Sequence, residues 1–84
     1  MPHVIVKLYP GRTEQRKKRL ADAIVKDVVM IAGCEEKSVS VAIEEVDPDD
    51  WAEKVYRPEI LNKHTILYRK PGYNPFEKPT KRES

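Results

Sequence analysis

The chain has 84 residues, of which 39% are apolar and 36% are charged, with a formal net charge of +2 and a pI near 8.7. A chain of this size makes one small domain, and it buries only about 60% of the surface that its unfolded form exposes. The pI argues against a nucleic-acid-binding module, for which a value above about 9 is typical. No segment approaches the roughly 20 apolar residues of a membrane span, and no secretory leader is recognisable. We therefore expect a cytoplasmic protein with neither a membrane nor a nucleic-acid partner.

A chain this short cannot form a large hydrophobic core, so its stability must have another source. The single cysteine, Cys34, cannot form an intramolecular disulfide. Small chains without such staples commonly gain stability by self-association. A homo-oligomer is the expected state.

A strand followed by a helix is predicted for the first part of the chain. Side chains alternate between apolar and mixed over residues 4–9, and the pair Pro10-Gly11 then implies a turn. Thr13 is a suitable helix cap, and apolar residues recur beyond it at helical spacing. This stripe consists of Leu20, Ala21, Ile24, Val28 and Ile31. Gly33 is placed to end the helix in a left-handed conformation.

A second strand is predicted over residues 38–46, which completes a βαβ unit with parallel strands and a right-handed crossover. Two strands leave their own edges unpaired. Pairing with the same unit of a second chain would give a four-stranded sheet covered by helices on one face. The fold class is α/β (α+β), with short C-terminal helices.

The C-terminal part opens with a strong helix start at residues 47–50, where a cap and a proline precede two acids. Pro58 is expected to interrupt this helix and to open another over residues 59–69. From residue 74 the composition is rich in proline and charge, which is typical of a flexible tail. The predicted domain is therefore 1–73, and the predicted tail is 74–84.

The most reactive group of the chain would arise at its start. If Met1 is removed, the ring nitrogen of Pro2 becomes a free secondary amine at the beginning of the first strand. Desolvation and a nearby cation both lower the pKa of an amine towards neutrality, where a general base works best. Arg12 could bind a carboxylate through two parallel hydrogen bonds. We expect a catalytic Pro2 and a substrate-binding Arg12, against the simpler interpretations of an ordinary second residue and a solvated turn residue.

In order and spacing, these segments resemble the 4-oxalocrotonate tautomerase family, and most of all its longer, dimeric branch that acts on phenylpyruvate-like enols. The opening Pro-His-x-x-x-Lys-x-x-Pro of that branch matches Pro2, His3, Lys7 and Pro10. Its Pro-x-x-Trp and Lys-Pro-Gly-Tyr motifs match residues 48–51 and 70–73. The resemblance covers roughly residues 2–73.

The resemblance implies a keto–enol isomerase without metal or organic cofactor, in which Pro2 moves a proton between oxygen and carbon of a 2-hydroxy-dienoate or a phenylenolpyruvate-like acid. It also favours a dimer over a hexamer, because the chain is longer than hexameric members. Typical members carry a second arginine where this chain has Ser40, so Ser40 is expected to hydrogen-bond the substrate, and a monocarboxylate fits better than a dicarboxylate. Trp51 stands where the family has an aromatic pocket wall, and plain core packing is the other interpretation.

Other polar residues are assigned weaker roles. His3 and Lys7 share one strand face and could flank the site, although surface placement is favoured. The four cations of residues 16–19 could form a phosphate or nucleic-acid patch, but Glu14 and Asp22 offset their charge.

Two alternatives to a tautomerase stay open. One is a hydratase or decarboxylase of unsaturated or keto acids in the same superfamily. The other is a non-catalytic interaction protein that keeps the fold. No metal site is expected, because His3, Cys34 and His64 lack a ligand spacing.

Overall fold

A computed structural model describes residues 1–77 of the chain. The chain folds into two compact units, of which the first is Met1–Val46 and the second begins at Asp47. Residues 78–84, the end of the predicted tail, lie outside the described residues. Within the described part, no helix is both long and apolar enough to cross a membrane.

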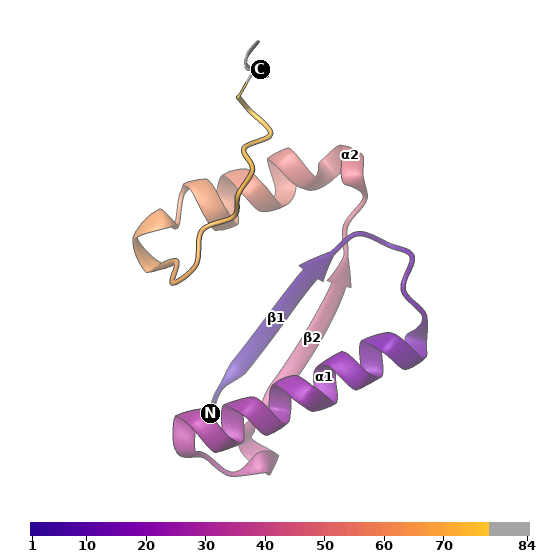
Figure 1. Cartoon of the computed structure of the whole chain (residues 1–84), viewed down its shortest axis with the longest axis vertical. Coiled ribbons are helices and arrows are strands. Elements are labelled where there is room, and N and C mark those ends of the chain that lie inside the picture. Colours follow the sequence, from indigo (N-terminus) through magenta and orange to yellow (C-terminus); the bar gives the residue numbers. More distant parts are fainter. Residues whose placement is uncertain (78–84) are drawn as a thin grey trace. The chain divides into compact units, whose positions relative to one another are not determined.

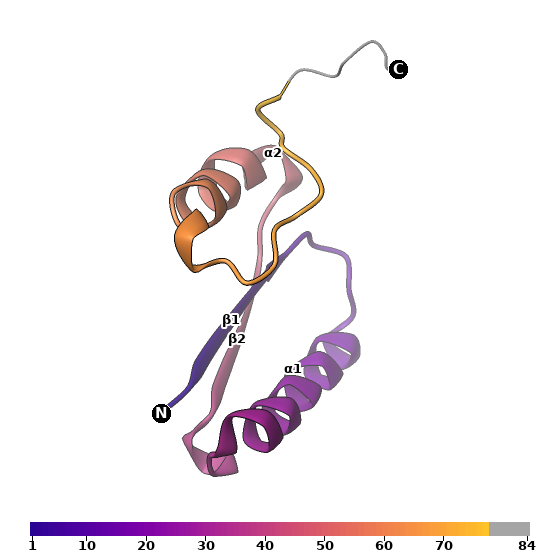
Figure 2. The same ribbon diagram turned by 60° about the vertical axis from the view of Figure 1, so that its left-hand side comes forward.

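The first unit is the predicted βαβ unit. Strands β1 (His3–Leu8) and β2 (Ser40–Glu45) are parallel and pair from His3↔Ser40 to Leu8↔Glu45. Helix α1 (Glu14–Val28) connects them and lies along one face of the strand pair (Figures 1 and 2). The α+β class and the parallel pairing are therefore confirmed.

Helix α1 begins where the sequence predicts. The Oγ1 atom of Thr13 accepts a hydrogen bond from the backbone N–H of Arg16 at 3.1 Å and so caps the first turn. The helix then widens into a π-type turn, η1 (Val29–Gly33), and Gly33 ends it with φ +73°. Ile31 and Leu20 are 82% and 38% exposed, so their predicted places in the buried stripe were wrong. A π turn holds more residues than an α turn, which moves Ile31 off the stripe.

The first unit lacks a closed core. None of residues 1–46 is fully buried, and the strand residues that face α1, such as Val4 and Val6, are half-buried. The opposite sheet face carries Ile5, which is 50% exposed, and an ion pair of 3.9 Å between Lys7 and Glu44. A short 3-10 turn, η2 (Glu36–Ser38), leads into β2.

The second unit starts with the predicted cap. Asp47 accepts a hydrogen bond from the N–H of Asp49 at 3.0 Å, and α2 (Pro48–Trp51) continues directly into η3 (Ala52–Leu61). The predicted break at Pro58 was wrong, because the helix passes through this proline. In η3 the winding is π-type, and this wider turn relieves the clash that a proline ring makes with the carbonyl four residues earlier.

The C-terminal end of the second unit also differs from the prediction. A single 3-10 turn, η4 (His64–Ile66), replaces the helix expected over residues 59–69.

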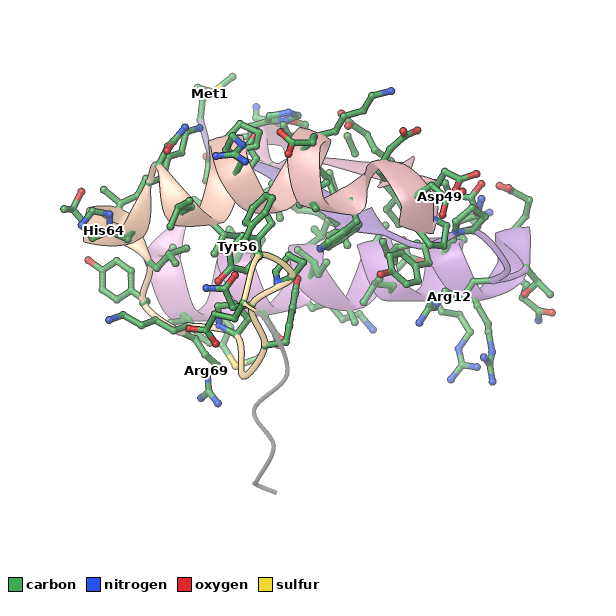
Figure 3. All side chains as sticks on the ribbon, turned by 90° about the horizontal axis from the view of Figure 1, so that it is seen from above. Met1, Arg12, Asp49, Tyr56, His64 and Arg69 are labelled. Atoms are coloured by element: carbon green, nitrogen blue, oxygen red, sulfur yellow. The ribbon has the colours of Figure 1, made fainter. Side chains whose placement is uncertain are left out.

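Aromatic side chains form the centre of the second unit. Val55 and Tyr56 are buried, with 4% and 7% of their surface exposed. The Tyr56 ring, labelled in Figure 3, packs 5.5 Å from the Tyr73 ring and 5.8 Å from the Phe76 ring, centroid to centroid. The guanidinium of Arg57 lies 4.4 Å from the Phe76 centroid. Phe76 belongs to the predicted tail, and it contacts the helix through these rings.

Candidate active site

Strand pairing positions Pro2 at one end of the sheet. Its carbonyl accepts a hydrogen bond from the backbone N–H of Ser40 at 3.1 Å, so the start of β2 holds the residue before β1. Pro2 is half-buried, whereas Met1 is fully exposed. With Met1 in place, the Pro2 nitrogen is an amide nitrogen and has no lone pair available for a proton.

Ser40 is also joined to the strand beside it through its side chain. The hydroxyl Oγ lies 2.6 Å from Nδ1 of His3, and either group can donate, depending on the imidazole tautomer. Both residues are exposed and form the first residue pair of the parallel sheet. The structure thus brings Pro2, His3 and Ser40 together.

Sequence reasoning favoured a surface place for His3 and did not connect it to Ser40. Side chains of paired residues in a parallel sheet point to the same face, but the two predicted strands do not by themselves give the register that pairs these two residues.

Arg12 lies at the other end of the same strand. Gly11 turns the chain with φ +128°, and the Nη1 atom of Arg12 donates back to the carbonyl of Tyr9 at 3.2 Å. The six residues of β1 span about 20 Å at roughly 3.3 Å per residue. Figure 3 shows the labelled Met1 and Arg12 well apart. One small ligand therefore cannot contact both Pro2 and Arg12 of the same chain.

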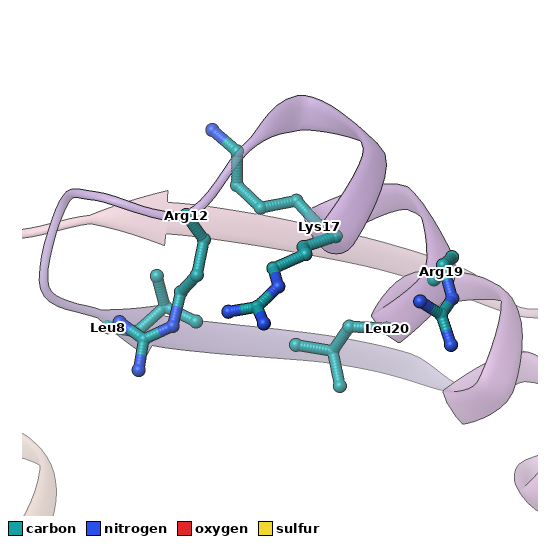
Figure 4. A pocket seen from close by; sticks show the side chains of 6 residues that line it. Leu8, Arg12, Lys17, Arg19 and Leu20 are labelled. Atoms are coloured by element: carbon teal, nitrogen blue, oxygen red, sulfur yellow. The ribbon is translucent and has the colours of Figure 1, made fainter.

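An open pocket adjoins Arg12. It has a volume of about 360 Å³, within the range of pockets that hold small ligands. It is lined by Leu8, Arg12, Arg16, Lys17, Arg19 and Leu20. Figure 4 shows this group at the end of β1 and the first turns of α1.

Among residues 1–77, only one of the four cations in this pocket is paired with acids. The Nζ of Lys17 lies 2.7 Å from Oε2 of Glu14 and 3.2 Å from Oε2 of Glu45. Hydrogen bonds to these two carboxylates raise the pKa of Lys17 above its ordinary value, and the bond to Glu14 has the largest effect. The amine of Lys17 is directed away from the Arg12 head group in Figure 4. The remaining cations are all guanidinium groups.

Trp51 lies in the second unit. Its indole Nε1–H donates to the hydroxyl of Tyr73 at 2.7 Å, and the side chain is half-buried. This hydrogen bond connects Trp51 to the aromatic residues around Tyr56. Its predicted role as a pocket wall stays a prediction.

Comparison with known proteins gives one consistent family. The family model described as tautomerase enzyme matches residues 2–57. The chain is 38% identical over 79 residues to a probable tautomerase of Xylella fastidiosa, covering 94% of this chain and 96% of that protein. It is 39% identical over 74 residues to the tautomerase PptA of Cronobacter sakazakii, covering 87% of this chain and 97% of that protein.

Solved structures agree with these sequence matches. YwhB, a homologue of 4-oxalocrotonate tautomerase, superposes with a TM-score of 0.59 at 33% identity, covering 64% of this chain and 88% of that chain. TomN, a 4-oxalocrotonate tautomerase homologue from tomaymycin biosynthesis, gives a TM-score of 0.58 at 30% identity, covering 60% and 77%.

Proposed function

The chain belongs to the tautomerase family and is an isomerase of the tautomerase type, and we propose that the amino group of Pro2, freed by removal of Met1, is its general base. The observation that carries this proposal is the hydrogen bond of 3.1 Å from the Ser40 N–H to the Pro2 carbonyl. It holds the terminal residue against a second strand, so the amine would keep a fixed position. A base in a fixed position is a more effective catalyst than a mobile one, because the geometry of proton transfer is set before the substrate binds.

The proposed substrate is a 2-keto acid in its enol form, such as phenylenolpyruvate or a 2-hydroxy-dienoate. The Pro2 nitrogen takes the proton of the enol hydroxyl and delivers a proton to carbon, which yields the ketone and regenerates the neutral amine. Ser40 Oγ would hydrogen-bond the oxygen that changes between hydroxyl and carbonyl, and the contact of 2.6 Å with His3 Nδ1 supports a role of His3 in orienting this Ser40 hydroxyl. This proton transfer is complete without a metal or organic cofactor.

The proposal requires a second copy of the chain, because Pro2 and Arg12 of one chain lie at opposite ends of β1. A two-fold axis that pairs the β1 edges antiparallel would place the start of one β1 beside the end of the other. Arg12 of the partner subunit would then hold the substrate carboxylate near Pro2. Two features support such pairing: no residue of the first unit is buried, and each strand of the two-stranded sheet has an unpaired edge within the first unit. We propose a homodimer rather than a hexamer.

Ser40 also bears on the substrate class. A hydroxyl cannot neutralise a second carboxylate, so a monocarboxylate such as phenylenolpyruvate suits this site better than a dicarboxylate whose second carboxylate lies near Ser40. Trp51 is kept as a proposed aromatic residue of the pocket wall, and its ring is half-buried.

The test is the rate at which phenylenolpyruvate ketonises with the wild type and with Pro2→Ala, after intact mass has confirmed both N-termini. We expect conversion well above the buffer rate and a fall in kcat/KM in the variant of up to the roughly 10²–10⁴-fold that a general base contributes, because the flexible primary amine of alanine replaces the ring amine. A preparation that retains Met1 is the matched control, because it keeps Pro2 but not its amine, and it should be inactive. Conversion equal in all three proteins would refute Pro2 as the base, and conversion no faster than buffer would favour a non-catalytic role.

A further inference from the structure

The pocket at the end of β1 holds more positive charge than one carboxylate needs. Arg12, Arg16 and Arg19 all line it. Arg16 and Arg19 are three residues apart on α1, so they lie on one face of the helix, and Arg12 approaches from the preceding loop. The run of cations in residues 16–19 is therefore divided between different surfaces.

The neighbouring lysines contribute little unpaired positive charge to this pocket, although Lys17 is part of its lining. Lys17 is neutralised by Glu14 and Glu45, as described above. Lys18 lines a different pocket, formed with Ala21, Val41 and Ile43 among others. By contrast, the guanidinium groups of Arg16 and Arg19 make no ion pair or hydrogen bond within residues 1–77. The pocket thus contains three arginines that make no ion pair within residues 1–77.

Three guanidinium groups around one small pocket repel one another, and a bound anion would relieve this repulsion. A single carboxylate can be held by one arginine through two parallel hydrogen bonds, and this leaves the other two without a counter-charge. Leu8 and Leu20 add apolar surface to the same pocket, and Leu20 is 38% exposed. The lining therefore combines positive charge with apolar surface, and Leu20 lies between Arg19 and Arg12 in Figure 4.

We propose that this pocket binds a small organic molecule whose end group carries two negative charges close together, with Arg16 and Arg19 holding the charge that Arg12 does not. Two chemistries share this feature, a pair of carboxylates on neighbouring or identical carbons and a phosphate monoester. This proposal rests on the proposed function for the role of Arg12 as the residue that binds the substrate carboxylate. It adds that the ligand carries a second negative charge beside this carboxylate rather than at the Ser40 end. A ligand of this kind is either the natural substrate or a competitor for its carboxylate site.

The experiment compares ligands that differ by one charge. Binding of 3-phenylpropionate, benzylmalonate and phenyl phosphate is measured by calorimetry or by amide chemical shifts, at constant ionic strength. Benzylmalonate is 3-phenylpropionate with one additional carboxylate, so the pair isolates the second charge. We expect at least one of the two dianions to bind about tenfold tighter than 3-phenylpropionate, and the better one identifies the end group.

Variants then assign the preference to residues. Arg16→Gln combined with Arg19→Gln should reduce the preference for the dianion to less than about threefold, whereas Lys18→Gln removes a charge from the same helix turn and should leave it intact. No preference in the wild type would overturn the proposal. So would an equal loss in Lys18→Gln, which would show a general charge effect, or tight binding of an oligonucleotide without any preference for the dianions.

These measurements involve no turnover. They can be repeated in Pro2→Ala, which keeps the pocket, so failure of the charge preference is distinguishable from failure of Pro2 as the base.

Discussion

The Nδ1 atom of His3 lies 2.6 Å from the hydroxyl oxygen of Ser40, across the first residue pair of the parallel sheet. The same Ser40 holds Pro2 through its backbone N–H. One residue thus joins the candidate base to a titratable side chain. If the imidazole fixes the hydroxyl orientation, its effect on catalysis should act only through Ser40.

This relationship predicts coupling between the two residues in a double-mutant cycle. His3→Ala and Ser40→Ala should each lower kcat/KM for phenylenolpyruvate, and the double variant should be no worse than the poorer single one. The expected coupling is about 1 kcal/mol, or roughly fivefold in rate, which is the usual net value of a hydrogen bond. His64→Ala removes the other histidine, which contacts Leu61 in the second unit, and serves as the control. Fully additive losses would show that His3 does not act through Ser40.

Strand and helix positions in the first unit could be predicted because they follow from side-chain alternation, a cap and a terminal glycine. Contacts between strands could be predicted less well, since the register that pairs His3 with Ser40 is set by the whole sheet. The separation of Pro2 and Arg12 follows from the length of β1 alone. Its consequence, a site shared between chains, needs a partner that one sequence does not contain.

The errors at Ile31 and Pro58 have one cause. Both predictions assume 3.6 residues per turn, and both residues lie in segments of wider winding. A regular period of 3.6 residues does not predict this winding, although a proline inside a helix, such as Pro58, is a local feature that a wider turn accommodates. The pairing of Trp51 with Tyr73, 22 residues apart, is likewise a result of the fold.

A shared site predicts complementation between two inactive variants. In a mixed dimer of Pro2→Ala and Arg12→Ala chains, one site combines both changes and the other combines an intact Pro2 with an intact Arg12. Random reassortment makes half of the dimers mixed, so about a quarter of all sites should recover wild-type activity. The measurement mixes the two variants under mild denaturant, allows exchange, and records the ketonisation rate.

Two controls accompany the mixing experiment. Each variant treated alone should stay at its own low rate. A mixture that never exceeds the mean of the two variants would contradict a site built from both chains, provided that mass spectrometry has confirmed mixed dimers.

The left-handed conformation of Gly33, the last residue of η1, predicts that Gly33→Ala lowers the stability of the chain. A Cβ there would meet no atom within 4 Å, so the effect of Gly33→Ala comes from its φ of +73° alone. We expect a loss of about 1–2 kcal/mol in the free energy of unfolding, measured by urea denaturation. Gly72→Ala is the matched control, because Gly72 has an equally open surrounding without the left-handed conformation, and it should be neutral or slightly stabilising. Equal effects at both glycines would contradict the conformational explanation.

The ion pair between Glu53 and Arg57 predicts how the stability of the folded chain depends on pH. The Nε of Arg57 donates to Oε1 of Glu53 at 2.9 Å and Nη2 donates to Oε2 at 3.2 Å. These hydrogen bonds lower the pKa of Glu53 below its ordinary value. A lowered folded-state pKa gives stability that is present above the unfolded pKa of about 4.3 and is lost as the pH falls through the folded one.

Glu53→Gln should therefore lower Tm slightly at neutral pH, and the difference from wild type should shrink towards zero as the pH falls well below 4. The effect is small because the pair is exposed to solvent, and salt should reduce it further. Glu36→Gln removes an exposed glutamate that makes no ion pair within residues 1–77, and its Tm difference should not follow this profile. A Glu53→Gln difference that stays constant from pH 7 down to pH 3 would instead assign the loss to packing beside Arg57 and Phe76.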